Sequence, residues 1–132
     1  MADESTELKV RLVRDDETGW YNAPASNAID GDASSRWASD WSDNQSIAVD
    51  LGSVQPVSRV VLNWESAYGR GYQIQLSPDG VTWHDAAVIT DGDGGTDNVA
   101  FAPSEARFVR MQGVQRGTKH GYSLYEFEVY AH

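Results

Sequence analysis

Tyr72-Gln73-Ile74-Gln75-Leu76-Ser77, followed directly by Pro78-Asp79-Gly80, sets a pattern that recurs along most of this chain. Apolar and polar side chains alternate before the Pro-Asp-Gly triplet, which has the composition of a turn. A period of two places the two sets of side chains on opposite faces of an extended strand. Residues 71–77 are therefore predicted to form a strand with one buried face.

The same period appears on both sides of this segment. Alternating apolar sets occur at Ile47, Val49 and Leu51 and at Tyr125, Phe127 and Val129. Residues 57–64 are apolar on both faces, as expected for a central strand that is covered on two sides. The remaining predicted strands cover residues 8–13, 86–90, 98–102 and 107–114.

Short turn sequences separate these runs, and they include Asp30-Gly31, Leu51-Gly52-Ser53 and Asp91-Gly92-Asp93-Gly94-Gly95. None of the prolines at 24, 56, 78 and 103 is expected to interrupt a strand. No helical period extends over more than one turn. The sequence therefore predicts an all-β protein, an antiparallel β-sandwich jelly roll of about eight short strands.

The length of 132 residues fits a single domain with one core. Residues 1–7 are predicted to be a polar N-terminal tail and residues 8–132 the folded module. Met1–Glu7 shows no cationic lead into an apolar segment, so the sequence is expected to be either a cytoplasmic protein or a module of a longer secreted protein.

The charge balance excludes two classes of partner. Twenty acidic residues against ten basic ones give a formal charge of −10, and the cations are scattered. Nucleic acid and anionic membranes both require a basic patch, so neither is an expected partner. The chain has no cysteine, which excludes disulfides and thiolate sites.

Two long segments, residues 15–41 and 115–123, break the strand pattern and place aromatic side chains among polar residues and glycines. A sugar offers an apolar face of C–H groups and an edge of hydroxyls, so its site needs flat aromatic rings beside charged or amide groups. The stacking candidates are Trp20, Trp41, Tyr68 and Tyr122, and the polar candidates are Glu17, Arg36, Glu65 and Arg70. The alternative is that most of these aromatics fill a core, to which Trp37, Trp64 and Trp83 are assigned.

Residues 27–35 gather carboxylates, hydroxyls and carbonyls around the Asp30-Gly31 turn. Oxygen ligands at short spacing suit Ca²⁺, but an acidic turn capped by its own side chains explains the same pattern. Residues 91–97 also imitate a calcium loop, although a hairpin turn is the better interpretation because Gly95 stands at a ligand position.

Evidence for catalysis is thin. Glu65 has no identifiable partner carboxylate for glycoside hydrolysis, and His84, His120 and His132 lack metal-ligand spacing. The chain is therefore not expected to be an enzyme.

Taken in order, several segments resemble the factor V/VIII type C (discoidin-like) domains, and among these the carbohydrate-binding modules of family 32. The matching segments are residues 28–39, 47–52, 64–69, 72–77 with the turn at 79–83, 106–111 and 121–130. The resemblance runs from about Leu8 to the C-terminus. It implies a β-sandwich without catalytic activity, with one structural Ca²⁺.

The resemblance also implies the metal ligands. Asp30 and Glu126 would give carboxylates, Ser35 its hydroxyl and carbonyl, and Asn27, Asp32 and Tyr125 carbonyls. Glu126 is the distant carboxylate that the local sequence of residues 27–35 lacks, so the resemblance favours the metal over the capped turn.

For the ligand, the resemblance implies a site on the loops at one end of the sandwich. The positions are Glu17, Trp20, Arg36, Trp41, Glu65, Tyr68 and the segment from Lys119 to Tyr122. The His, Arg and Asn set of galactose-specific members cannot be placed on these loops. The segments at Trp64-Glu65 and Gly121–Leu124 look more like modules appended to chitosanases and β-glucanases.

The sequence thus predicts a secreted, monomeric, noncatalytic module that binds an oligo- or polysaccharide, with chitosan-type glucosamine oligomers or β-glucan preferred. It would belong to a larger multidomain glycoside hydrolase and direct that enzyme to its substrate. The alternative function is a discoidin-like adhesion domain that binds a protein or a cell-surface glycan.

Overall fold

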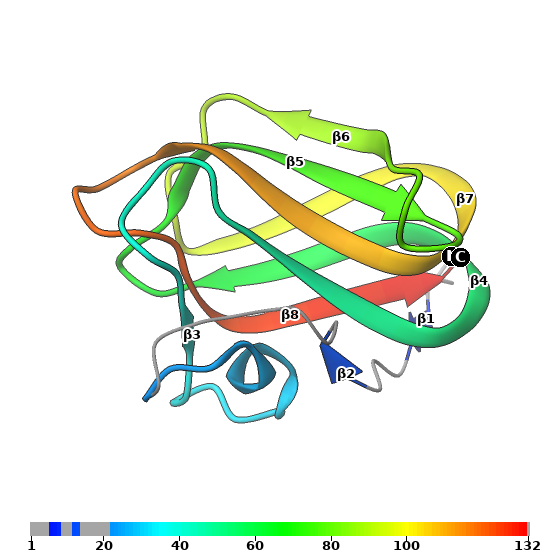
Figure 1. The fold of residues 1–132 in the computed structure, drawn as a ribbon, viewed down its shortest axis with the longest axis horizontal. Coiled ribbons are helices and arrows are strands. Elements are labelled where there is room, and N and C mark those ends of the chain that lie inside the picture. The colour runs from blue at the N-terminus through cyan, green and yellow to red at the C-terminus, as the bar shows by residue number, and fades with distance from the viewer. Residues whose placement is uncertain (1–5, 9–11, 14–21, 132) are drawn as a thin grey trace, which may run out of the picture.

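The computed structural model describes residues 6–8, 12–13 and 22–131 (Figure 1). Its elements are β1 (Thr6–Leu8), β2 (Leu12–Val13), the 3-10 helix η1 (Ala25–Ile29), β3 (Trp37–Ala38), β4 (Ser46–Trp64), β5 (Gly69–Ser77), β6 (His84–Ile89), β7 (Thr96–Arg116) and β8 (Ser123–Ala131). Every strand pair in the described ranges is antiparallel. The predicted all-β class is confirmed. In the described part of the chain, no helix is long and apolar enough to span a membrane.

Two long strands, β4 and β7, connect the layers of the sandwich. Residues 46–50 of β4 pair with 108–112 of β7, and residues 59–63 pair with 96–100. Strands β5 and β6 extend the first half, whereas β8 and β1 extend the second. Figure 1 shows the two layers with the long strands curving between them. One chain segment therefore contributes to both sides of the core.

The boundaries of the two long strands differ from the prediction. Pro56 and Pro103, which fall between predicted strands, lie inside β4 and β7 but do not interrupt them. The β4–β7 register shifts on both sides of Pro56 and passes from Ser104 to Ala100 without pairing Pro103. Because proline has no N–H to donate, it is tolerated at such irregularities. Each long strand therefore joins two segments that the sequence pattern separates.

The N-terminal boundaries also differ. Thr6 and Glu7 belong to β1, which pairs with β8, although they fall in the predicted tail. The single strand predicted over residues 8–13 corresponds to parts of two short strands, β1 and β2.

The core lies between the two layers. Its fully buried side chains include Ile47, Leu62, Ile74, Met111 and Phe127. Each contributes about 1.5–3 kcal/mol through removal of apolar surface from water. Trp37 and Trp64 are buried, as predicted. Trp83 is only partly buried, and the Arg110 guanidinium lies 3.9 Å from its ring centroid, so its assignment to the core is corrected.

An ion pair joins β4 and β7 at Asp50, where the first shift in the β4–β7 register begins. Arg107 donates from Nε to Asp50 Oδ1 at 2.8 Å and from Nη2 to Oδ2 at 3.0 Å. The Gly52 amide donates to the same carboxylate at 2.8 Å. The Arg107 hydrogen bonds, opposed by burial and assisted by the Gly52 bond, lower the pKa of Asp50.

Candidate binding site

A pocket of about 280 Å³ lies where several loops meet at one end of the sandwich. The loops follow β3, connect β4 to β5 and connect β7 to β8, and they gather on the left in Figure 1. The pocket is lined by Arg36, Ala38, Ser39, Trp41, Glu65, Ser66, Ala67, His120, Gly121, Tyr122 and Ser123. It thus contains Arg36, Trp41, Glu65 and Tyr122 from the predicted sugar site.

Trp41 and His120 form an aromatic side of this pocket. Trp41 is 53% exposed, which is unusual for the largest apolar side chain. Its ring centroid lies 4.9 Å from that of His120, and the two planes are 76° apart. This edge-to-face contact holds the indole while leaving half of its surface accessible.

Arg36 and Glu65 supply the charge in the pocket. Arg36 Nη1 donates to Ser123 Oγ at 2.9 Å and lies 3.9 Å from Glu65 Oε1. Glu65 also accepts from Ser66 Oγ at 2.6 Å and from the Ala67 amide at 3.2 Å. Burial opposes ionisation, but the bonds from Ser66 and Ala67 and the charge of Arg36 outweigh it, so the pKa of Glu65 is lowered. The carboxylate is therefore charged at neutral pH.

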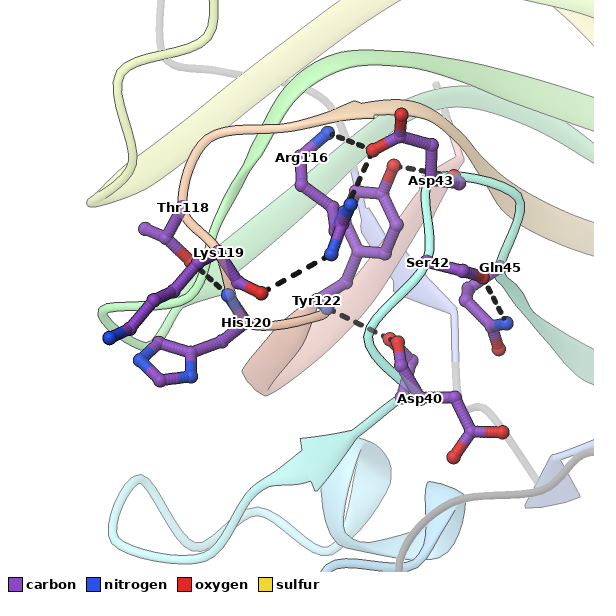
Figure 2. A network of polar contacts seen from close by, with 10 residues as sticks. Asp40, Ser42, Asp43, Gln45, Arg116, Thr118, Lys119, His120 and Tyr122 are labelled. Carbon is purple, nitrogen blue, oxygen red and sulfur yellow. Dashed lines mark hydrogen bonds and ion pairs between the residues drawn. The ribbon is translucent and has the colours of Figure 1, made fainter.

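A polar network fixes the loop of Trp41 against the loop of His120 (Figure 2). Arg116 donates from Nε to Asp43 Oδ1 at 2.8 Å and from Nη1 to the Lys119 carbonyl at 3.2 Å. Tyr122 donates its hydroxyl to the Asp43 carbonyl at 2.7 Å. Its amide donates to Ser39 Oγ at 2.8 Å. These bonds hold together the two segments that form the aromatic side of the pocket.

Tyr122 does not present its ring for stacking, in contrast to its predicted role. The residue is 0% exposed, and a Cβ on Gly113 would stand 2.3 Å from the tyrosine Cζ. The ring therefore occupies the space that the missing side chain of Gly113 leaves. Burial and the nearby Asp43 charge raise the pKa of its hydroxyl to about 12. Tyr122 borders the pocket but belongs to the core.

Three other predicted residues lie outside the pocket. Tyr68 packs on loop glycines, since a Cβ on Gly117 would stand 2.3 Å from its ring. Lys119 is exposed and contributes its backbone carbonyl to the network. Arg70 is exposed and does not line the pocket either. Glu17 and Trp20 fall outside the described residues.

His120 is a pocket residue that the sequence predicts only as part of a segment and not by itself. It lies in the segment from Lys119 to Tyr122, but a lone histidine between polar residues and a glycine gives no periodic signal. The one sequence feature that points to His120 is the glycine that follows it, because a glycine can mark a place where the backbone packs closely against another segment. A Cβ on Gly121 would stand 2.3 Å from the Asp40 carbonyl oxygen, so only glycine fits there.

The proposed metal residues meet at a second place in the fold. Ser35 Oγ donates to Asp30 Oδ2 at 2.5 Å and lies 3.2 Å from the Asp32 carbonyl. The Asp32 amide donates to Asp30 Oδ1 at 2.9 Å, and Asn27 Nδ2 donates to the Arg36 carbonyl at 3.1 Å. The loop is thus ordered by its own side chains.

Glu126 on β8 faces this loop. Its Oε1 atom is buried and has no hydrogen-bond partner. Burial, followed by the charge of Asp30, raises the pKa of Glu126 to about 7. A buried carboxylate oxygen beside a second acid fits a cation-binding role, because a cation would satisfy the oxygen and offset the repulsion. The described residues contain no cluster of three or more His, Cys, Asp or Glu side chains, so other ligands would be hydroxyl and carbonyl oxygens. Tyr125, predicted to give a carbonyl, is the half-buried residue beside Glu126.

The chain is similar to solved sugar-binding modules. Chitosan-binding module 1 derived from a chitosanase/glucanase of Paenibacillus sp. IK-5 is 44% identical, with a TM-score of 0.89 over 96% of this chain and 99% of that one. Module 2 of the same enzyme, solved with chitotriose, is 39% identical, with a TM-score of 0.82 over 96% and 95%.

A curated relative gives the wider context. The polysaccharide lyase 8 family protein HylA of Enterococcus faecalis is 33% identical over 111 residues, which are 78% of this chain but 8% of that protein. The chain thus spans a small part of this relative. The neighbours support the coarse function expected from the sequence, a carbohydrate-binding module.

A family model also matches residues 27–111, which include the pocket residues Arg36, Trp41 and Glu65 and the Asp30 loop. The chain therefore belongs to the family of NedA-like, galactose-binding domains within the F5/F8 type C group.

Proposed function

We propose that this chain is a noncatalytic module that binds chitosan-type glucosamine oligomers in the pocket between Trp41 and Glu65. The observation that carries the proposal is that a charged carboxylate and a half-exposed indole line the same pocket. Among the described residues that line the pocket, Glu65 is the one acid, whereas glycoside hydrolysis requires a pair.

Each group matches a part of an amino sugar. The indole of Trp41 offers a flat apolar surface to the C–H face of the ring. The Glu65 carboxylate can accept charge-assisted hydrogen bonds from an ammonium group, and Arg36 can donate to hydroxyl oxygens. The similarity to two chitosan-binding modules of Paenibacillus supports this choice of ligand.

β-Glucan is the alternative ligand. A neutral glucan would stack on Trp41 and bond to Arg36, but it would gain nothing from the charge of Glu65. A discoidin-like adhesion domain that binds a protein surface is the second candidate function, and the family match to F5/F8 type C domains supports it.

Glu65→Gln tests the amine contact. The variant is expected to weaken glucosamine oligomers about tenfold and neutral cello- or laminari-oligosaccharides much less, because only the ammonium ligand loses a charge-assisted bond. Titration calorimetry measures both ligands. Glu105→Gln, an exposed acid on β7 outside the pocket, is the matched control and should bind like the parent protein.

Two results would overturn parts of the proposal. Equal losses on charged and neutral sugars would indicate a neutral ligand. Absence of binding to chitosan, laminari- and cello-oligosaccharides, together with binding to a protein, would favour the adhesion domain.

A structural Ca²⁺ is part of the proposal. Asp30 and Glu126 would hold it with carboxylates, Ser35 with its hydroxyl and carbonyl, and Asn27, Asp32 and Tyr125 with carbonyls. The buried, unpartnered Oε1 atom of Glu126 supports this assignment. The ion would supply no chemistry to the pocket. It would join the loop at residues 27–35 to β8.

The module is further proposed to act as a monomer within a secreted multidomain glycoside hydrolase. Its similarity to modules derived from a chitosanase/glucanase supports this context. A single open pocket binds weakly, but attachment to an enzyme raises the local concentration of substrate around the catalytic domain.

A further inference from the structure

We infer that Asp97 is a positioning residue, which fixes the direction of Glu65 in the pocket by holding the indole of Trp64. This inference rests on the proposed function and adds to the same pocket a residue that does not line it. Asp97 belongs to the segment 91–97, whose sequence imitates a calcium loop. It lines a second cavity of about 280 Å³, apart from the pocket that contains Glu65.

One carboxylate oxygen of Asp97 accepts hydrogen bonds from two buried aromatic residues. The Trp64 Nε1 atom donates to Asp97 Oδ2 at 3.0 Å, and the Tyr72 hydroxyl donates to the same oxygen at 2.5 Å. Burial, followed by the hydrogen bond to Asp97 and the charge of Asp97, raises the pKa of the Tyr72 hydroxyl. The hydroxyl therefore remains a donor at neutral pH, and Asp97 Oδ2 serves as a shared anchor for both rings.

Trp64 stands at the point where regular strand pairing ends. It is the last residue of β4, Glu65 follows it directly, and the β4–β8 register shifts immediately before it. A register shift changes the direction of the chain, so other bonds must fix the backbone here. The Trp64 amide donates to the Gly95 carbonyl at 2.8 Å, and the Glu65 amide donates to the Ser123 carbonyl at 2.9 Å. The chain around the start of β7 thus holds both the backbone and the indole of Trp64.

The indole also reaches the far end of the loop between β4 and β5. A Cβ on Gly69, where β5 begins, would stand 3.1 Å from Trp64 Cη2. The indole lies near Tyr122 as well, with the two ring centroids 6.4 Å apart. Residues 65–67 line the pocket, so the indole supports both ends of the stretch that carries the Glu65 carboxylate.

Loss of the Asp97 anchor should therefore affect one kind of ligand more than another. A charge-assisted hydrogen bond depends on distance and angle, so a carboxylate that turns with its loop holds an ammonium group less well. A supporting group that restricts such movement improves binding without touching the ligand. A neutral sugar stacked on Trp41 does not depend on the direction of Glu65.

Asp97→Ala tests this inference. Its affinity for a glucosamine trimer is expected to fall about threefold, which on a logarithmic scale is half of the loss of about tenfold expected for Glu65→Gln. Affinity for a neutral cello- or laminari-trimer should change by less than about 1.5-fold. In a Glu65→Gln background the same substitution should have little further effect, because the group that it misplaces is already altered. Titration calorimetry measures the Kd of the parent, the two single variants and the double variant.

Three further variants separate position from charge and from stability. Asp97→Asn keeps an oxygen that can accept both bonds, so it should restore binding to within about 1.5-fold of the parent. Tyr72→Phe is the matched control for stability, because it removes a bond to the same oxygen and leaves the Trp64 bond in place. It should lower the free energy of unfolding without changing the Kd of either ligand. Trp64→Phe cannot donate to Asp97 and should reproduce the selective loss, also where Asp97→Ala fails to fold.

The outcomes distinguish the inference from the proposed function. Equal glucosamine losses in Asp97→Asn and Asp97→Ala would assign the effect to charge and overturn the positioning role. Equal losses on charged and neutral trimers, or an undiminished loss in the Glu65→Gln background, would overturn it too. In each case the proposed function stands if the parent protein binds the glucosamine trimer and Glu65→Gln weakens it selectively. Absence of trimer binding in the parent protein overturns both.

Discussion

Trp41 and Tyr122 both border the pocket, but their side chains act in different ways. The indole is half exposed and held at one side by His120. The tyrosine ring is buried against Gly113, and its hydroxyl binds the Asp43 carbonyl. Trp41 is therefore placed to meet the proposed ligand, whereas Tyr122 orders the loops that carry the other pocket residues.

Substitution should separate these two roles. Trp41→Ala is expected to lower sugar affinity about tenfold, because it removes the stacking surface, with little change in the free energy of unfolding. Tyr122→Phe is expected to lower the free energy of unfolding by about 1 kcal/mol through loss of one hydrogen bond. Calorimetry and urea unfolding measure the two effects. A Tyr122→Phe protein of normal stability that fails to bind would instead make its hydroxyl a ligand contact.

For single residues, the sequence predicted which side chains gather at one pocket better than it predicted which aromatic rings are buried. Arg36, Trp41 and Glu65 were selected because charged and aromatic residues in loops suit a sugar, and they do line one pocket. Tyr122 could not be assigned to the core, because its burial depends on Gly113, which is distant in sequence. His120 lies in the predicted segment from Lys119 to Tyr122, but its contact with Trp41 depends on the fold and cannot be read from the sequence.

The sheet elements depend on the bent pair β4 and β7, which the Asp50–Arg107 ion pair joins. Asp50 is buried and Arg107 is partly exposed. Because the pKa of Asp50 is lowered in the folded state, the pair stabilises the protein above the carboxyl's unfolded pKa. That stability is lost as the pH falls through the lower, folded value.

Asp50→Asn is therefore expected to have a pH-dependent effect on stability. At neutral pH the variant should lose about 1 kcal/mol of unfolding free energy, and its difference from the parent should shrink below about pH 4. Urea unfolding at several pH values gives the difference directly. Glu105→Gln is the control on the same strand pair. A pH-independent loss for Asp50→Asn would assign its effect to packing.

Strand identity was readable from the period of two, but strand continuity was not. The alternating sets around Ile47 and Phe127 became strands as expected. Strand β4 continues through Pro56 and strand β7 continues through Pro103. Shifts in the β4–β7 register beside these residues allow a proline, which has no N–H to donate, within the strand. Local patterns do not contain this information, since the shift depends on the partner strand.

For the molecule as a whole, the proposed Ca²⁺ would connect the loop at residues 27–35 to the last strand. Chelation is expected to lower the melting temperature by about 5–10 °C, because an ion that binds only the folded state adds a few kcal/mol of stability. Calorimetric melting with and without chelator measures the shift.

Glu126→Gln is the matched variant for this test. With one carboxylate removed, its melting temperature should respond little to chelator. An unchanged melting temperature of the parent protein after chelation would remove the calcium proposal. Ligand preference should remain the same in the metal-loaded protein, because the pocket does not include these residues.

The passage of β4 and β7 through both layers also affects how the chain must fold. Neither layer can be completed from a local hairpin, because residue 46 must find residue 112 and residue 59 must find residue 130. Closing such long loops costs entropy before any pairing is gained. The shared strands make the two layers one cooperative unit, whose folding is expected to take roughly milliseconds to seconds rather than microseconds.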